Sequence, residues 1–285
     1  MKKITIVTGA SSGMGVCFAV QLAKESSELS KSPDPKTRDL ASDEIWIVAR
    51  RQDRLEETKR RIESEVRPED GNPPTVKCIG LDISGKTGAN ALKSLLDGEN
   101  SSADGGIRIN VLVNNAGFGT YGEFADTDAN REMDMIDLDC TSLTGITGFA
   151  LPYMGRGSRI INTASLASFM PLGNFAVYGA CKAYVLSFSV AIAAELKPKG
   201  ISVTALCPGP VSTEFANVAS RGARVKVRHG KDPEKTVAHC IKKSRKGKLY
   251  SMWAFKWKFK AAASRFIGRY LGAWFTFKYC KRPSN

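Results

Sequence analysis

Residues 3–15 read KITIVTGASSGMG, a short β-branched apolar run that ends in a glycine-rich turn. The run predicts a buried strand over residues 3–8, and a helix is expected to follow the turn. Gly9 permits a sharp turn, Gly13 lets the backbone approach a pyrophosphate, and Gly15 lets the helix pack close to the strand. The start of that helix would present free N–H groups and a positive dipole end to phosphates. The stretch therefore favours a dinucleotide site over a plain turn.

Strands and helices alternate along the rest of the chain. Helices are predicted over 16–24, 51–67, 87–96, 132–153, 175–196 and 232–246, and further strands over 45–49, 76–81, 109–113, 159–163, 201–206 and 248–253. The alternation predicts an α/β fold, a Rossmann-like doubly wound parallel sheet of about seven strands with helices on both faces. We expect a single domain over 1–285, with surface loops at 26–43 and 98–106. Ligands on such sheets bind beyond the carboxyl ends of the strands.

The composition is that of an ordinary globular protein with an unusual tail. Hydrophobic residues make up 42% of the 285 residues and charged residues 25%, so a core can form without disulfide or metal support. The net charge is +14, but residues 221–285 carry 19 Lys/Arg against 2 Asp/Glu, a net charge of +17, and the rest of the chain carries −3. This asymmetry indicates a surface or partner role for the tail.

Cysteine and histidine usage narrows the possible chemistry. The seven cysteines include no CxxC pair, and His229 and His239 are the only histidines. The odd count and scattered spacing indicate free thiols in a reducing cytosol, so we expect a cytoplasmic protein. A histidine triad is disfavoured, and no metal site is expected. The sequence contains no run of 18 or more apolar residues, so it predicts no transmembrane helix. The apolar run before Gly9 is too short for a signal peptide.

Charged residues follow the second and third predicted strands. Arg50 and Arg51 stand where an enzyme that prefers NAD usually has an acidic residue. Two arginines suit a 2′-phosphate, which they bind through charge-assisted hydrogen bonds. In the alternative interpretation, both arginines belong to the solvated start of a charged helix. We favour the first interpretation, in which the arginines select NADP(H). Asp82 is placed either to accept from an adenine amino group or to cap the next helix.

Small and amide residues follow the fourth predicted strand, in the order Asn114, Asn115, Ala116 and Gly117. Residues of this kind let a flat ring lie along the edge of the sheet. They also form hydrogen-bonded turns that tie strands together. The two interpretations are compatible, so the sequence predicts both.

Ser165 follows the fifth predicted strand, and Tyr178 and Lys182 come next at helical spacing. An i, i+4 pair lies on one face of a helix. A free tyrosine has a pKa of about 10, too high for a general base near neutrality, and a nearby ammonium lowers it. A core tyrosine and a surface lysine at this spacing are also common. The inference of an acid–base pair therefore depends on the combination with Ser165 and the glycine loop.

In combination, these motifs resemble the short-chain dehydrogenases/reductases of the classical type. The resemblance covers about residues 3–215 and is carried by TGASSGMG at 8–15, NNAG at 114–117, YGACK at 178–182 with Ser165, and CPGPVST at 207–213. It implies NADP(H) as the cofactor. The residues that it implies for cofactor binding are Gly9, Ser11, Ser12, Gly13, Met14, Gly15, Arg50, Arg51, Asp82, Ile83, Asn115, Ala116, Gly117, Tyr178, Lys182, Pro208, Gly209, Val211 and Thr213.

The resemblance also implies catalytic roles. Tyr178 would be the general acid in reduction and the base in oxidation, Lys182 would lower its pKa and hold the nicotinamide ribose, and Ser165 would hydrogen-bond the substrate oxygen. The family usually has an asparagine where this chain has Asp139. Aspartate keeps the acceptor but loses the amide donor, and its charge is expected to raise the pKa of Lys182. Asp139 is therefore included in the predicted catalytic set.

The tail is predicted to form a substrate lid and a basic, aromatic helical extension of the same domain over 214–285, with a mobile loop over 214–231. One face of the predicted helix carries Phe259, Ala263, Phe266, Tyr270 and Trp274, and another carries Lys258, Arg265 and Arg269. The pattern fits an interfacial helix on an anionic membrane, a cover over an apolar pocket, or a subunit contact. Peripheral membrane contact is thus one of three interpretations that stay open.

The sequence therefore predicts an NADP(H)-dependent ketone reductase, or the reverse dehydrogenase, for a steroid-like or lipid-like apolar substrate, as in a hydroxysteroid dehydrogenase. A 3-oxoacyl-carrier-protein reductase is the alternative enzyme, because basic residues can bind an acidic carrier. The alternative from another class is a catalytically silent NADP-binding sensor or scaffold, which only Asp139 supports. No nucleic-acid partner is expected, and the resemblance implies a homo-oligomer, a dimer or tetramer.

Overall fold

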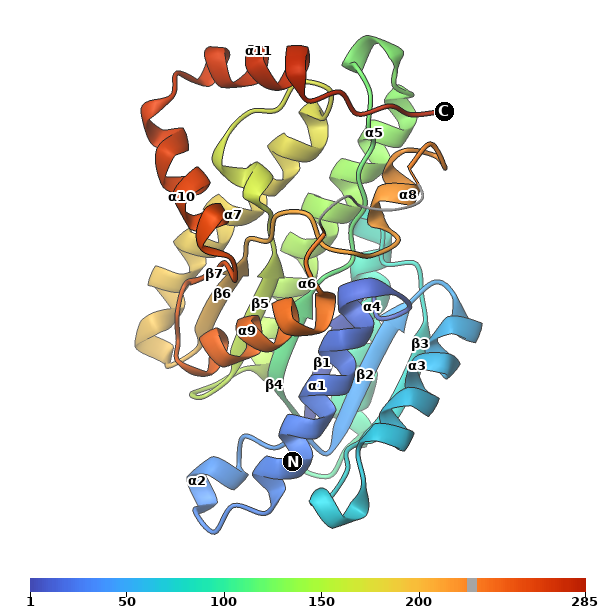
Figure 1. The fold of residues 1–285 in the computed structure, drawn as a ribbon. Coiled ribbons are helices and arrows are strands. Elements are labelled where there is room, and N and C mark those ends of the chain that lie inside the picture. Colours follow the sequence, from blue (N-terminus) through green and yellow to red (C-terminus); the bar gives the residue numbers. More distant parts are fainter. Residues whose placement is uncertain (225–229) are drawn as a thin grey trace.

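A seven-stranded parallel sheet lies at the centre of the computed structural model, which describes residues 1–224 and 230–285 (Figure 1). The strand order is β3-β2-β1-β4-β5-β6-β7, and each neighbouring pair is parallel. The order reverses beside β1, so the sheet is doubly wound and the predicted fold class is confirmed. The strands are β1 (Lys2–Thr8), β2 (Glu44–Ala49), β3 (Thr75–Gly80), β4 (Ile107–Asn114), β5 (Arg159–Thr163), β6 (Ser202–Leu206) and β7 (Tyr250–Ser251).

Helices cover both faces of the sheet (Figure 1). The helices α1 (Gly13–Ser30), α3 (Gln52–Glu65) and α9 (Pro233–Arg245) pack together on one face. The other face carries α4 (Gly85–Ser102), α5 (Ala129–Ile136), α6 (Leu143–Ala150) and α7 (Ala176–Leu196). This arrangement leaves the carboxyl ends of the strands open between the two layers.

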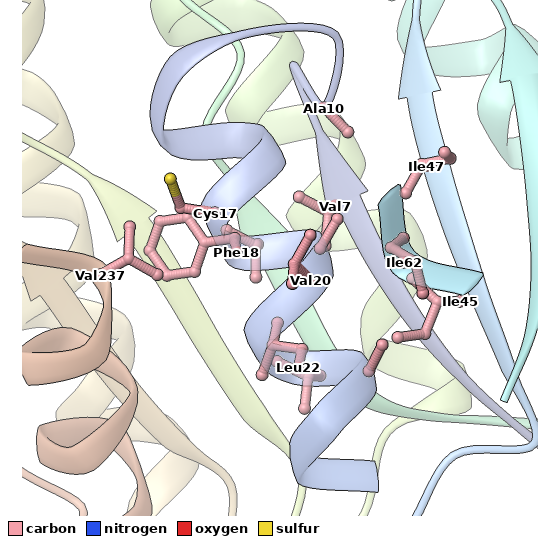
Figure 2. Close-up of a cluster of buried hydrophobic side chains, with 14 of the residues drawn as sticks. Val7, Ala10, Cys17, Phe18, Val20, Leu22, Ile45, Ile47, Ile62 and Val237 are labelled. Carbon is pink, nitrogen blue, oxygen red and sulfur yellow. The ribbon is translucent and has the colours of Figure 1, made fainter. Parts of the chain in front are cut away.

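The largest buried cluster forms between α1 and the sheet. Figure 2 shows Phe18 of α1 next to Val237 of α9, and Val20 next to Val7 of β1. The Phe18 and Leu22 side chains are almost fully buried. Removing a buried phenylalanine side chain costs about 3–5 kcal/mol, so this packing fixes the position of α1 beneath the glycine loop.

The helix α1 is longer than predicted. It continues through Ser30 into the segment predicted as a surface loop over 26–43, and α2 (Pro35–Arg38) shortens that loop further. Polar side chains stay in the helix here because they have buried partners. Arg159 Nη2 donates to Glu25 Oε1 at 2.6 Å, and the N–H of Ser42 donates to Ser26 Oγ at 2.8 Å. Polarity alone therefore gave a wrong prediction for the end of α1.

Other predicted boundaries also change. The helix α4 extends through Ser102 into the predicted loop 98–106, and β7 spans two residues instead of 248–253. Within the predicted loop 214–231, α8 (Phe215–Ala219) is helical. Residues 225–229, which include His229, lie outside the described residues.

The predicted tail helix is broken into two. The helix α10 (Phe255–Ala263) runs into a 3₁₀ turn at Ser264–Phe266, and α11 (Arg269–Tyr279) follows. Gly268 is the N-cap residue of α11, with an extended ψ of 134° that a continuous helix does not allow. The prediction of one helical face across this segment is therefore wrong.

One helix in the described part of the chain is long and apolar enough to span a membrane, over Ala176–Lys199. It includes α7, which packs against β5, β6 and α5 and buries side chains from Tyr178 to Leu196. Its apolar composition is explained by that position against the sheet.

Candidate active site

The glycine loop leaves the start of α1 uncapped. Ser12, the N-cap residue, is extended and its side chain makes no capping hydrogen bond, and the first turn holds no acidic residue. Gly9 has a φ of 68°, which favours glycine, and a Cβ there would lie 2.8 Å from the Cα of Ala116. A Cβ on Gly15 would collide with the carbonyl group of Gly9. The loop thus forms a cradle in which backbone N–H groups can reach an anion.

Two arginines stand at the carboxyl end of β2, beside the glycine loop. Arg50 and Arg51 are both exposed. Arg51 Nη2 donates to the Oγ of Ser11 at 3.2 Å and lies 3.7 Å from a carboxylate oxygen of Glu214. The guanidinium is therefore held at the rim of the cradle by exposed contacts, which contribute little stability and can be exchanged for a ligand.

Asp82 follows β3 and faces the same space. Its Oδ1 accepts from the N–H of Ser84 at 2.9 Å, so it closes the turn before α4 and is not the N-cap of that helix. Burial would raise the pKa of Asp82, but the hydrogen bonds from Ser84 and the charge of Arg50 outweigh it and lower the pKa. An ionised carboxylate keeps spare acceptor capacity for an amino group.

Asn114 and Asn115 tie three strands together. Asn114 Nδ2 donates to Asn162 Oδ1 at 2.9 Å. The N–H of Asn115 donates to Thr8 Oγ1 at 3.0 Å, and its Nδ2 donates to the Thr8 carbonyl at 3.2 Å. These contacts hold the carboxyl ends of β1, β4 and β5 in fixed positions, as one of the two sequence interpretations predicted.

Ser165 and Lys182 are held by the end of β5. Ser165 begins a 3₁₀ turn, and its Oγ accepts from the N–H of Ala167 at 3.1 Å. The hydroxyl hydrogen of Ser165 is thus free to donate elsewhere. Lys182 on α7 donates from Nζ to the carbonyl oxygen of Thr163 at 3.0 Å. Ser165 is therefore positioned by the backbone of the 3₁₀ turn, and Lys182 by the last residue of β5.

Tyr178 lies in an aromatic environment one helical turn before Lys182. Its ring stacks on Phe175, with centroids 4.1 Å apart, and contacts Phe215 at 5.3 Å. Burial raises the pKa of Tyr178 above 10, and the charge of Lys182 and the hydroxyl of Ser165 oppose that rise only in part. The phenol is therefore protonated at neutral pH and suited to donate a proton.

Asp139 forms a buried ion pair with Lys182. It lies in a π-helical turn at Asp137–Ser142, between α5 and α6, and is 1% exposed. Its Oδ1 accepts from the N–H of Phe118 at 3.0 Å, and its Oδ2 lies 2.9 Å from Lys182 Nζ. Burial, the largest single effect, would lower the pKa of Lys182, but the charge and hydrogen bond of Asp139 together with Tyr178 and Cys181 outweigh burial and raise the pKa, in the direction that the sequence predicted. Lys182 is therefore kept charged.

One cavity of about 1580 Å³ joins the glycine loop to Tyr178. Gly15 and Asp139 are not among its described lining residues. Gly15 packs the start of α1 against Gly9 and Asn115, and Asp139 forms an ion pair with Lys182. The predicted site residues that line it are Gly9, Ser11, Ser12, Gly13, Met14, Arg50, Arg51, Asp82, Ile83, Asn115, Ala116, Gly117, Ser165, Tyr178, Lys182, Pro208, Gly209, Val211 and Thr213.

Several cavity residues were not predicted from the sequence. Phe175, Phe215, Tyr121 and Arg282 all line the cavity. Phe175 precedes Tyr178 by three residues, a helical spacing that points to contact between their rings. Arg282 has its Cζ 5.2 Å from the Phe175 ring centroid. No sequence pattern connects a residue so near the C-terminus to this ring.

The C-terminal helices close one side of the cavity. Trp257 of α10 is buried and packs against Gly209, where a Cβ would collide with the indole. Thr276 Oγ1 of α11 accepts from the N–H of Gly173 at 2.9 Å, and Arg282 Nη1 donates to the Gly173 carbonyl at 2.9 Å. The tail residues that reach the cavity lining are Lys260, Ser264, Tyr279, Cys280, Lys281, Arg282 and Pro283.

Comparison with known proteins identifies relatives across most of the chain. A sequence model of the short chain dehydrogenase family matches residues 36–224. The sulfoacetaldehyde reductase of Chromohalobacter salexigens is 30% identical over 226 residues, 78% of each chain. The very-long-chain 3-oxoacyl-CoA reductase-B of Danio rerio is 30% identical over 76% of this chain and 62% of its own.

Solved structures share the fold. A short-chain dehydrogenase from Sphingobium yanoikuyae in complex with NADPH has a TM-score of 0.72 at 24% identity, covering 93% of this chain and 94% of its own. A short chain dehydrogenase/reductase from Burkholderia phymatum in complex with NAD has a TM-score of 0.71 at 18% identity, covering 100% and 97%. At these identities the likeness concerns the fold alone.

Proposed function

The chain belongs to the short-chain dehydrogenase family of oxidoreductases, and we propose that it is an NADP(H)-dependent ketone reductase or alcohol dehydrogenase for an apolar, steroid-like or lipid-like substrate. The observation that carries this proposal is the cavity that brings Tyr178, Lys182 and Ser165 together with the glycine loop. The cofactor, when bound, supplies or accepts the hydride. The residues of the chain bind, orient and exchange a proton.

The cradle at α1 fits a dinucleotide phosphate. The uncapped start of α1 would hold the pyrophosphate, because its N–H groups are accessible and no carboxylate competes for them. Arg50 and Arg51 would hold a 2′-phosphate, which supports NADP(H) over NAD(H). Asp82 would accept from the adenine amino group. The two named structures carry NADPH in one case and NAD in the other, so the preference rests on the arginines.

The proton chemistry is assigned to Tyr178. In reduction, its phenol would donate a proton to the substrate carbonyl oxygen, while Ser165 donates a hydrogen bond to the same oxygen from its free hydroxyl hydrogen. Lys182 would stabilise the phenolate that remains, because Asp139 keeps the lysine charged. In oxidation the phenolate would accept the proton. The raised pKa of Tyr178 favours the reductive direction at neutral pH.

The cavity wall supports an apolar substrate. Rings and apolar side chains surround Tyr178, among them Phe118, Tyr121, Phe175 and Phe215, with Met170 and Leu172 beside them. Burial of such rings against a ligand contributes roughly 25 cal/mol per Å² of apolar area. Specificity for apolar ketones would follow from that contact.

A purified sample should oxidise NADPH in the presence of bulky apolar ketones. We expect kcat/KM with NADPH to exceed that with NADH at least tenfold. Steroid ketones, long-chain ketones and small hydrophilic ketones form the test panel. Turnover of only the hydrophilic ketones would contradict the apolar assignment, and equal use of NADH would contradict the role of the arginines.

A 3-oxoacyl thioester reductase is the second candidate. Lys260, Lys281 and Arg224 line the tail side of the cavity and would attract the acidic carrier of a thioester. Relatives from Danio rerio, Rattus norvegicus and Mus musculus are named as very-long-chain 3-oxoacyl-CoA reductases. Including 3-oxoacyl thioesters in the same panel decides between the candidates, because the preferred substrate is the one with the higher kcat/KM.

We also propose a cytoplasmic homo-oligomer, a dimer or tetramer. The outward face of α7 carries small exposed residues, including Ala180, Ala183, Ser187 and Ala191, which let a second helix approach closely. Light scattering after size exclusion would measure the mass. A strictly monomeric protein at micromolar concentration would contradict this proposal.

A further inference from the structure

The C-terminal helices expose an unusual number of large hydrophobic side chains. More than half of those that are exposed in the described part of the chain fall within 255–279. Phe266 is 90% exposed, Tyr270 is 83% exposed and Phe255 is 81% exposed. Large exposed apolar patches on soluble proteins usually mark an interaction site. We call this set the aromatic face; it comprises Phe255, Phe259, Phe266, Ile267, Tyr270, Leu271, Trp274 and Phe275.

The aromatic face is not the side on which these helices pack. The helix α10 buries Trp257 and Ala261, and α11 buries Gly272 and Thr276, an i, i+4 pair in each case. The aromatic face lies opposite these pairs. On α11, Tyr270 and Trp274 lie on the outward side while Thr276 bonds to the protein body. The inward contacts are thus already made, and the outward rings remain exposed in the described part of the chain.

Positive charge surrounds the aromatic face. Residues 255–285 contain eight Lys/Arg and no Asp/Glu. Lys278 Nζ lies 5.0 Å from the Trp274 ring centroid, so charge and ring share one surface. In Figure 1, α10 and α11 lie along the outer margin of the molecule, at the end opposite α2. Exposed aromatic rings among lysines and arginines match the interface of a bilayer that contains anionic lipid.

We propose that the aromatic face docks on an anionic lipid bilayer, which places the cavity rim at the membrane surface. A second copy of this chain fits less well, because two faces of the same positive charge would repel across a symmetric contact. An anionic bilayer accounts for both the positive charge and the exposed rings. Its headgroups neutralise the basic residues, and its acyl boundary accepts the rings.

The helices α10 and α11, which carry the aromatic face, also contribute residues to the cavity. Trp257 fixes α10 on the loop at Gly209, and Lys260 and Ser264 of the same segment line the cavity. Tyr279 and Lys281 line it from the end of α11. A lipid-like substrate would therefore pass from the bilayer to the cavity past residues of the tail itself. This last step rests on the proposed function, whereas docking does not.

Vesicle flotation with the full chain tests the docking. The vesicles are phosphatidylcholine alone, or phosphatidylcholine with phosphatidylglycerol. We expect binding to the anionic vesicles at least tenfold stronger than to the neutral ones, and weaker binding as salt is raised. The triple variant Phe266→Ser, Tyr270→Ser, Trp274→Ser should lose binding at least tenfold. The control Leu95→Ser, on the distant helix α4 with 42% exposure, should bind like the unchanged protein.

Two double variants with the same change in net charge distinguish the effect of charge on the aromatic face from the effect of the total charge of the protein. Lys256→Glu with Lys278→Glu should abolish binding to the anionic vesicles. Lys31→Glu with Lys36→Glu makes the same change in net charge near α2, at the other end of the molecule, and should leave binding nearly unchanged. Equal loss in both pairs would overturn the assignment to this face.

Three further results would overturn the proposal. These are no binding of the unchanged protein to anionic vesicles at low salt, full binding by the triple variant, and a fall in oligomeric mass in the triple variant, which would assign the face to a second copy. Because flotation needs no turnover, its outcome is independent of whether the protein reduces ketones.

Discussion

Asp139 places a carboxylate at the position where the resemblance to the family implies an amide. It pairs with Lys182 in a buried position. Its negative charge also acts to raise the pKa of Tyr178. The pair thus keeps the lysine charged but weakens its effect on the phenol, since the two charges oppose each other at Tyr178.

The variant Asp139→Asn should shift the pH profile. Asparagine keeps the acceptor for the Phe118 N–H but removes the charge, so the pKa of Tyr178 should fall. Reduction needs the protonated phenol, so its decline at high pH should begin at a lower pH. Oxidation needs the phenolate, so its rate at neutral pH should rise.

The kcat profiles in both directions measure this effect. Asp126→Asn is the control for charge removal, because Asp126 is exposed and is not among the cavity-lining residues. Profiles that are identical for the unchanged protein and Asp139→Asn would show that Asp139 does not act on Tyr178 by charge.

The paired arginines give a second prediction at the residue scale. Arg50→Ala with Arg51→Ala should lower kcat/KM for NADPH about 10- to 100-fold, because a hydrogen bond to a charged group contributes about 1.5–3 kcal/mol. The value for NADH should change far less. Arg54→Ala is the control, since Arg54 pairs with Glu57 on the solvent side of α3. An equal loss for both cofactors would contradict the assignment of the arginines to a 2′-phosphate.

Among the elements, the long helix α1 shows where sequence patterns are insufficient. Its end at 26–30 falls in the segment predicted as a loop, yet Ser26 and Ser27 are buried there, and the adjacent Glu25 is 4% exposed and pairs with Arg159 and Arg245. Those partners are far away in the sequence, so no local pattern reports them. The break at Gly268 also depends on contacts that are distant in the sequence, because the packing of Gly272 and Thr276 on the protein body decides where α11 begins.

The Glu25 ion pair should stabilise the fold. Glu25→Ala leaves Arg159 buried without a charged partner, and losing one member of a buried pair costs about 3–5 kcal/mol. Urea unfolding should report this loss of unfolding free energy. Glu28→Ala, on the exposed side of the same helix, should change it by less than about 0.5 kcal/mol. A Glu25→Ala protein as stable as the control would show that the pair contributes nothing.

At the scale of the whole molecule, the sequence predicts the fold class and most of the cavity. Buried strands alternate with amphipathic helices, and most of the chemical motifs follow a strand, so the parallel sheet brings Gly9, Asn115 and Ser165 to one edge. The sequence predicted a substrate lid over 214–285, but it did not predict the aromatic wall at Phe175 and Phe215 or which tail residues line the cavity. They depend on how α10, α11 and the loop after β6 fold back, which periodicity does not encode.

NADPH binding and single-turnover ketone reduction, measured on the unchanged protein and on Tyr178→Phe, test the role of Tyr178 most directly. We predict turnover by the unchanged protein, and a variant that binds NADPH with similar affinity but reduces the ketone about 10²- to 10⁴-fold more slowly. A variant that turns over at the unchanged rate would contradict the role of Tyr178. Tight NADPH binding by the unchanged protein with no turnover on any ketone or 3-oxoacyl thioester would contradict the enzyme assignment and favour a cofactor sensor.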